Sequence, residues 1–295
     1  MVALTRMQRP NVLVGYDGTE ENDVALRWAV EESRLRGLDL MICYCWHWPY
    51  PREHVDGGVQ AVIQRAGENL LREGVRRARQ LGAAGKVRTR LRREPVCDTL
   101  VAESHDAELI VVGSHDRDRL LEGSTAVRLP ARTHRPVIAV RHGGGPRGRV
   151  VAGVAGSRAA DAALGFAVEE AVLRDLDLHV VHGAWEPGAV PDSELPLFTD
   201  EEKLMEVRAA MLAEAVHPWK RRYPEVRMRV SPLLERPREA LLAAAGDAEL
   251  LVVGDRGLGG GDPLPLGATS SAMLHHAPCA VAVVPPPRHV PRHGA

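Results

Sequence analysis

The stretch NVLVGYDGTEENDVALRWAVEES at residues 11–33 decides the fold, because it returns as RVVAGVAGSRAADAALGFAVEEA at residues 149–171. Each copy opens with a short apolar run, passes through a glycine-bearing turn and then places apolar residues at helical spacing. This change of period is typical of a strand followed by a helix. Thr19 and Ser157 stand just before the two helical patterns and are predicted to be their N-caps.

The repeat continues along the chain. LDLMICYCWHWP (38–49) matches LDLHVVHGAWEP (176–187), and DAELIVVG (106–113) matches DAELLVVG (247–254). Self-similarity over such a distance indicates two copies of one domain. We expect a first domain at residues 1–141, a linker at 142–149, a second domain at 150–287 and an extended or disordered tail at 288–295.

Each copy contains five short apolar runs that alternate with helical patterns. This alternation predicts βαβ units, and a parallel sheet needs helices on both faces. We therefore expect the α/β class: two tandem doubly wound, Rossmann-like domains, each a five-stranded parallel sheet. The expected strands are NVLVGY, LMICYCW, VRTRL, ELIVVG and VIAVR in the first copy, and RVVAGV, LHVVHG, VRMRV, ELLVVG and VAVVP in the second.

Length and charge narrow the class of protein. A chain of 295 residues with 45% hydrophobic residues can build two cores. Its formal net charge of −1 gives no general attraction to nucleic acid or to an anionic membrane. The sequence has no signal peptide pattern and no apolar stretch of about 20 residues, so we expect a cytoplasmic protein.

The four cysteines lack the CxxC spacing of zinc ribbons and thioredoxin-like pairs. Cys43 and Cys45 are two residues apart in an expected strand and would share one face. We expect a buried, reduced pair, with a redox switch as the less favoured alternative.

A glycine-dense loop, VVGDRGLGGGDPLPLGATSS (252–271), follows the fourth expected strand of the second copy. Gly254, Gly257 and Gly267 form the pattern Gly-x2-Gly-x9-Gly, and a hydroxyl-rich helix start follows. In doubly wound sheets, ligands bind beyond the carboxyl ends of the strands. Backbone N–H groups of such a loop and of the next helix N-terminus can bind phosphate. The spacing alone is equally compatible with a flexible connection.

Together with VLVGYDG (12–18), the late segment GATSSAMLHHAPCAVAVV (267–284) resembles the universal stress protein family over nearly the whole chain. The resemblance implies a role in stress or dormancy responses through binding rather than catalysis. Some members bind ATP, and ATP with Mg²⁺ is the ligand implied here. An acidic residue after the first strand lies near the adenosine, and the glycine loop surrounds ribose and phosphates. Members without the motif bind no nucleotide.

Carried over to the first copy, the family pattern is only partly present. Asp17 matches the acidic residue, but the loop GSHDRDRLLEGST (113–125) has Asp116 where the second glycine belongs and is three residues shorter. An aspartate at that position would repel phosphate. The positions that do match are Gly15, Asp17, Gly113, Gly123 and Ser124.

The second copy has the opposite defect. Its loop is complete, but Ala155 replaces the acidic residue and Ala268 stands at the hydroxyl position, which leaves Thr269 or Ser270 to substitute. Asp262 adds a negative charge inside the loop. The matching positions are Gly153, Gly254, Gly257, Gly267, Thr269 and Ser270. We therefore expect weak ATP binding in the second copy, or a nucleotide-independent interaction module with two degenerate sites.

Other patterns favour structural interpretations. GGGPRG (143–148) fits Gly-x-Gly-x-x-Gly but opens no helix, so it is interpreted as a linker. No Walker A motif with its lysine occurs, and Ser114-His115-Asp116 and His275-His276 cannot converge on one site. We expect no enzyme activity and no metal site.

Aromatic residues and loops near the expected mouths leave alternatives open. Trp46, Trp48 and Trp185 are more typical of packing than of a stacking platform, although Trp185 and His182 would line the base pocket of any bound nucleotide. The proline-bearing segments 49–60 and 187–198 are either mobile covers or irregular surface.

For partners, the resemblance implies an intrachain pseudo-dimer in which the two last strands pair. A homodimer and unknown protein partners remain open, and we expect neither nucleic acid nor membrane as a partner.

Overall fold

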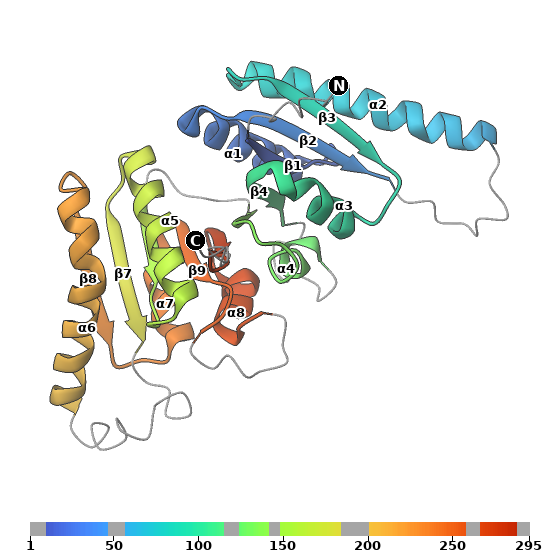
Figure 1. Ribbon diagram of the computed structural model, residues 1–295. Helices are drawn as coiled ribbons and strands as arrows, with labels where there is room; N and C mark the ends of the chain where they lie inside the picture. The colour runs from blue at the N-terminus through green and yellow to red at the C-terminus, as the bar shows by residue number, and fades with distance from the viewer. Residues whose placement is uncertain are drawn as a thin grey trace, which may run out of the picture. The chain divides into compact units, whose positions relative to one another are not determined.

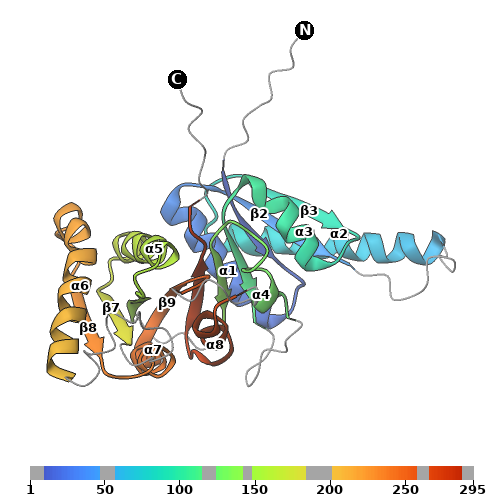
Figure 2. The same cartoon turned by 60° about the horizontal axis from the view of Figure 1, so that its bottom comes forward.

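The computed structural model describes residues 10–46, 57–114, 124–141, 148–183, 201–257 and 266–287. The chain divides into two compact units: strands β1 to β5 belong to the first and strands β6 to β10 to the second, which also includes residues 130–136. Each unit is built on five parallel strands with helices on both faces (Figures 1 and 2). The fold class predicted from the repeat is confirmed.

The first unit has the strand order β3-β2-β1-β4-β5. Helices α1 and α2 contact each other on one face of the sheet, and α3 and α4 contact each other on the other face. The elements are β1 (Asn11–Gly15), α1 (Glu20–Arg36), β2 (Asp39–Cys45), α2 (Gly57–Gln80), β3 (Val87–Arg92), α3 (Val96–Glu103), the 3₁₀ turn η2 (Ser104–Asp106), β4 (Ala107–Gly113), α4 (Thr125–Arg128) and β5 (Val137–Val140).

The second unit repeats this arrangement, with the order β10-β9-β6-β7-β8. Helices α5 and α6 contact each other on one face, and α7 and α8 on the other. The elements are β6 (Arg149–Gly153), α5 (Arg158–Arg174), β7 (Leu178–Gly183), α6 (Glu201–Arg222), β8 (Met228–Leu233), α7 (Pro237–Ala244), the 3₁₀ turn η5 (Ala245–Asp247), β9 (Ala248–Gly254), α8 (Ala268–His276) and β10 (Ala280–Val284).

Most expected strands agree with the structure to within one residue at each end. Strand β8 begins two residues later than expected, at Met228, and continues to Leu233. Arg149 is the first residue of β6 and not part of a linker, because it pairs with Ala248 of β9. Helix α2 begins at Gly57, inside the segment 49–60 expected to be either a mobile cover or irregular surface. Residues 49–56, 187–198 and 288–295, with Trp48 and Trp185, lie outside the described residues.

Both predicted N-caps are confirmed. The Thr19 hydroxyl accepts a hydrogen bond from the Asn22 N–H at 3.4 Å, and the Ser157 hydroxyl accepts one from the Ala160 N–H at 3.2 Å. These bonds satisfy N–H groups that lack a partner within the helix. The turn after each first strand is thereby fixed, and this turn forms one side of the candidate site.

The core includes one fully buried carboxylate in each unit. Glu32 bonds to Arg36 at 2.9 Å, and Glu170 bonds to Arg174 at 2.9 Å; both glutamate side chains are 0% exposed. The spacing of four residues places each pair on one helix face. A buried charge is tolerated only when it is paired, so each arginine compensates the glutamate on its own helix. Arg174 also bonds to Glu249 of β9 at 2.9 Å, which ties α5 to the sheet.

His179 on β7 makes the second unit sensitive to acid. Its ring is 8% exposed, and its Nε2 lies 2.9 Å from the Ser231 hydroxyl. Burial lowers the pKa of His179 below the ordinary value of 6.5, and Arg229 and Arg149 lower it further. Below pH 6.5 the unfolded chain therefore binds more protons at this site than the folded chain does. As the pH decreases from 6.5 to the lowered pKa of the folded state, the free energy of unfolding decreases.

We expect His179→Met to remove part of this acid sensitivity, because methionine does not titrate. Methionine should also fit the site, because it is the residue at the equivalent position 41 of the first unit. Melting temperatures recorded from about pH 7.5 to about pH 5 would test this. The loss of melting temperature over that range should be smaller in the variant than in the parent. His105→Met, at an exposed histidine, is the control and should retain the parent's slope. Parallel slopes for the parent and His179→Met would contradict the expectation.

Candidate functional site

The topology places a candidate site at the carboxyl ends of β6 and β9. These two strands are neighbours, and the strand order reverses between them. Helices α5 and α8 follow them, and each begins at this edge of the sheet. Ligands of doubly wound folds bind at such a point. The glycine loop lies here, and residues 254–257 and 266–271 of it are described.

Hydrogen bonds join the two described ends of the loop, residues 254–257 and 266–271. The Gly267 N–H donates to the Asp255 carbonyl at 2.8 Å. The Ser270 hydroxyl, in a residue only 5% exposed, donates to the Gly254 carbonyl at 2.5 Å. The start of α8 is therefore tied to the end of β9. Ser270 acts within the loop, whereas Thr269 is half-buried and Ala268 is exposed.

The three loop glycines differ in what surrounds them. A Cβ on Gly254 would lie 2.9 Å from the Ala159 carbonyl carbon, and one on Gly267 would lie 3.3 Å from the Arg256 Cα. Close packing against backbone atoms therefore explains why residues 254 and 267 are glycines. Among the described residues, a Cβ on Gly257 would meet nothing within 4 Å. Packing against this part of the chain does not account for glycine at position 257.

The start of α8 offers backbone donors to an anion. Gly267 is its N-cap and has no side chain to accept from the N–H groups of the first turn. Those groups lack partners within the helix and carry part of the helix dipole. An anion placed here would meet both.

Asp255 is a component that the sequence analysis did not single out. Its carboxylate is half-buried, and within the described residues its buried Oδ1 has no hydrogen-bond partner. Burial raises the pKa of Asp255, and the charge of Arg256 opposes this. The available signal was an acidic residue directly after Gly254, where the first copy has Ser114. Backbone N–H groups of Asp255 and Arg256 also stabilise the carboxylate, but a buried oxygen without a partner is costly unless a cation or a proton satisfies it.

The two units use the acidic position differently. In the first unit, the Asp17 Oδ1 accepts from the Thr19 N–H at 3.0 Å and from the Thr19 hydroxyl at 2.7 Å. In the second unit, Ala155 offers no such acceptor, and the Ser157 hydroxyl lies 3.3 Å from the Arg256 carbonyl of the glycine loop. The missing carboxylate therefore leaves the cap residue bonded to the loop.

His182 lies beneath the same edge of the second unit. Its ring is 9% exposed, and its Nδ1 lies 2.6 Å from the carbonyl oxygen of Val154, just after β6. Gly153 ends β6, and a Cβ there would lie 3.0 Å from Leu241 of α7. The contacts of His182 and Gly153 within the fold therefore account for these two residues without a ligand.

The first-unit candidates are only partly described. Gly15 ends β1, Gly113 ends β4, and Ser124 is the N-cap position of the four-residue helix α4. Gly123 and Asp116 lie outside the described residues. Ser124 makes no side-chain capping bond. Whether these residues form a nucleotide site stays a prediction.

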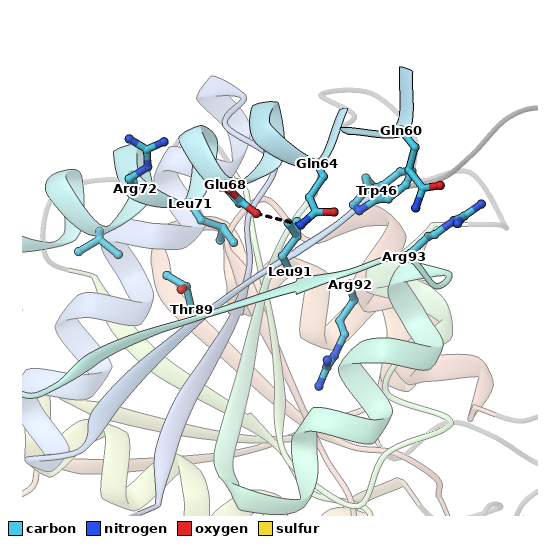
Figure 3. A pocket seen from close by; sticks show the side chains of 11 residues that line it. Trp46, Gln60, Gln64, Glu68, Leu71, Arg72, Thr89, Leu91, Arg92 and Arg93 are labelled. Atoms are coloured by element: carbon cyan, nitrogen blue, oxygen red, sulfur yellow. Dashed lines mark hydrogen bonds between the residues drawn. The ribbon is translucent and has the colours of Figure 1, made fainter. Parts of the chain in front are cut away.

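The first unit also has a groove of about 650 Å³ between α2 and the edge strand β3 (Figure 3). At one end Trp46 is 6% exposed, and the Arg93 guanidinium lies 5.3 Å from its ring centre. Gln64 donates to Glu68 at 3.0 Å along α2. Of these residues only Trp46 could be placed from sequence near the end of a strand, because the face that α2 turns to β3 depends on packing. The lining residues are Trp46, Gln60, Gln64, Glu68, Leu71, Arg72, Val75, Thr89, Leu91, Arg92 and Arg93.

The described residues show neither a metal centre nor a membrane-spanning helix. No group of three or more His, Cys, Asp or Glu side chains is arranged to hold a metal ion. His275 and His276 have ring centres 6.1 Å apart. Within the same part of the chain, no helix combines the length and the apolar character needed to cross a membrane.

Comparison with known proteins gives consistent matches. The model of the universal stress protein family matches residues 9–141 and, again, residues 146–285. A universal stress protein of Mycolicibacterium smegmatis is 31% identical over 93% of this chain and 97% of its own. One of Mycobacterium tuberculosis is 31% identical over 92% and 96%. A solved universal stress protein structure from Archaeoglobus fulgidus covers 94% of this chain and 99% of its own, with a TM-score of 0.67 and 18% identity, which concerns the fold alone.

Proposed function

This chain belongs to the universal stress protein family, and from that premise we propose that it is a non-catalytic stress-response protein whose second unit binds ATP with Mg²⁺. The site is the loop that carries Gly254, Gly257 and Gly267. In this proposal, binding changes the state of the protein and is not followed by turnover.

The observation that carries the proposal is the open space at Gly257. The other two loop glycines have close packing neighbours, but a Cβ at position 257 would enter space that no described atom occupies within 4 Å. Close approach of phosphate to backbone N–H groups needs such a position. The uncapped first turn of α8 adds donors on the same loop.

Asp255 fits the role of a magnesium ligand. Mg²⁺ in nucleotide sites is bound by one or two carboxylates together with phosphate oxygens. The Asp255 Oδ1 is buried and has no hydrogen-bond partner among the described residues, so a cation would relieve an existing cost. When bound, Mg²⁺ would neutralise phosphate charge beside this carboxylate. Without Mg²⁺, the same carboxylate would repel the nucleotide.

Ala155 sets the expected strength of binding. It removes the carboxylate that in other family members lies near the adenosine, so we expect weak binding in the parent. Ala155→Asp should restore an acceptor for the Ser157 hydroxyl, as Asp17 does for Thr19 in the first unit. We expect this variant to bind ATP about tenfold more tightly, the equivalent of one good hydrogen bond.

The test is a calorimetric titration of nucleotide-stripped protein with ATP, with and without Mg²⁺. We expect about one site per chain, lost in Gly257→Asp and retained in Gly246→Asp. Gly246 is the matched control, because it is exposed and a Cβ there also meets nothing within 4 Å. In Asp255→Asn, binding should no longer depend on Mg²⁺. Equal binding by the parent and Gly257→Asp would contradict the proposal.

The first unit favours the second candidate function, a nucleotide-independent interaction module. Its loop is three residues shorter, and Asp116 stands where the second glycine belongs. The stoichiometry separates the two functions. A value near one per chain assigns binding to the second unit, whereas no binding by a folded parent makes the interaction module the function of the whole chain.

A further inference from the structure

Two cysteine thiols meet on one face of the first sheet. Cys43 and Cys45 lie on β2, and their Sγ atoms are 3.9 Å apart. Cys43 is 2% exposed and Cys45 is half-buried, so a solute can approach the pair from the Cys45 side. The register pairs them with Arg90 and Arg92 of β3, which bond to Glu103 of α3. The thiols therefore lie on the face covered by α3, away from the groove under α2.

The strand disfavours direct oxidation of this pair to a disulfide. Residues two apart in a strand have Cα atoms about 6.6 Å apart, near the upper limit for a disulfide. The sulfur atoms would also have to move from 3.9 Å to about 2.05 Å. Both cysteines belong to the ladder with β3, and Cys43 also pairs with Gly15 of β1. Closing the bond would distort a strand held on both sides.

The two sulfur atoms are close enough for one ion to bind both. An ion held by two thiolates alone is close to linear, so with metal–sulfur bonds of about 2.3 Å the sulfur atoms would separate from 3.9 Å to about 4.6 Å. This movement is smaller than the approach to about 2.05 Å that a disulfide requires.

The number of protein ligands available at this pair favours copper(I) over zinc. A structural zinc site needs four protein ligands, and the described residues contain no group of three His, Cys, Asp or Glu that could provide them. Thiolates in low coordination select copper(I), a soft cation. We propose that Cys43 and Cys45 form a copper(I)-binding dithiol in the first unit. Binding releases two thiol protons and forms two Cu–S bonds, with no change in oxidation state.

The ion would reach the half-buried Cys45 before the buried Cys43. Binding must displace the protons of both thiols, so copper uptake is expected to be stronger at higher pH.

The experiment is a competition for copper(I) between the reduced full-length chain and the chromogenic chelator bicinchoninate under anaerobic conditions. We expect the parent to remove about one copper(I) per chain. Cys43→Val and Cys45→Ser should each lose this capacity. Valine is the equivalent residue, Val181, in the second unit, so Cys43→Val should preserve packing. Circular dichroism and the melting temperature establish that each variant is folded.

The other two cysteines supply matched controls. Cys97 and Cys279 are also buried and free. Cys97→Ser and Cys279→Ser should still remove about one copper(I) per chain and should retain the ultraviolet thiolate-to-copper absorption. Failure of the folded parent to compete with the chelator would overturn the proposal. So would equal copper uptake by the parent and a folded Cys43→Val/Cys45→Ser variant.

Discussion

Replacing Arg174 with methionine is expected to lower the free energy of unfolding of the second unit by about 3–5 kcal/mol. The Arg174 side chain is 3% exposed and bonds to Glu170 and to Glu249, each at 2.9 Å. Glu170 is 0% exposed, so its charge would lose this ion pair while remaining buried. Removing one member of a buried pair costs far more than the pair itself contributes. Denaturant unfolding followed by circular dichroism would measure the loss.

Arg227→Met is the control for this prediction. Arg227 also belongs to an ion pair in the second unit, but it lies 3.7 Å from Asp177, and both side chains are largely exposed. Exposed pairs contribute little because water screens them. We expect no measurable change in this variant. A loss in Arg174→Met no larger than in Arg227→Met would show that the buried pair is not a main support of α5.

Gly254→Ala is expected to destabilise the second unit by about 1–3 kcal/mol, because the new methyl group would overlap backbone. Its Cβ would lie 2.9 Å from both the carbonyl carbon and the Cβ of Ala159, in the first turn of α5. Neither atom is the end of a flexible side chain, so β9 or α5 must move. The Gly254 carbonyl also accepts from Ser270, and this movement would shift the start of α8.

Gly257→Ala provides the comparison for Gly254→Ala. Its Cβ would meet no described atom within 4 Å, so we expect an unchanged melting temperature and weaker ATP binding. Gly254→Ala should lower both. Melting curves and ATP titrations of the two variants would separate a glycine needed for packing from one needed for ligand approach. A destabilised Gly257→Ala would remove the main support for the proposed site.

The repeat between the two halves of the sequence determined the fold class, the parallel strands and both N-caps. These features could be predicted because they depend on local patterns: apolar runs of strand length, apolar residues at helical spacing, and a hydroxyl residue before each helix. Thr19 and Ser157 form their capping bonds with residues only three positions away. The resemblance of the loop with Gly254 and Gly257 to a family motif located the candidate site.

The tertiary structure alone decided which candidate residues are available to a ligand. Ser270 bonds to Gly254, sixteen residues away, and Ser157 bonds to Arg256, ninety-nine residues away. Such contacts depend on how α5, α8 and β9 pack, and no local period encodes them. Packing likewise separates Gly254 from Gly257, buries Asp255, and brings the Cys43 and Cys45 sulfur atoms to 3.9 Å. The sequence determined where the elements form, whereas long-range packing determined what their side chains can do.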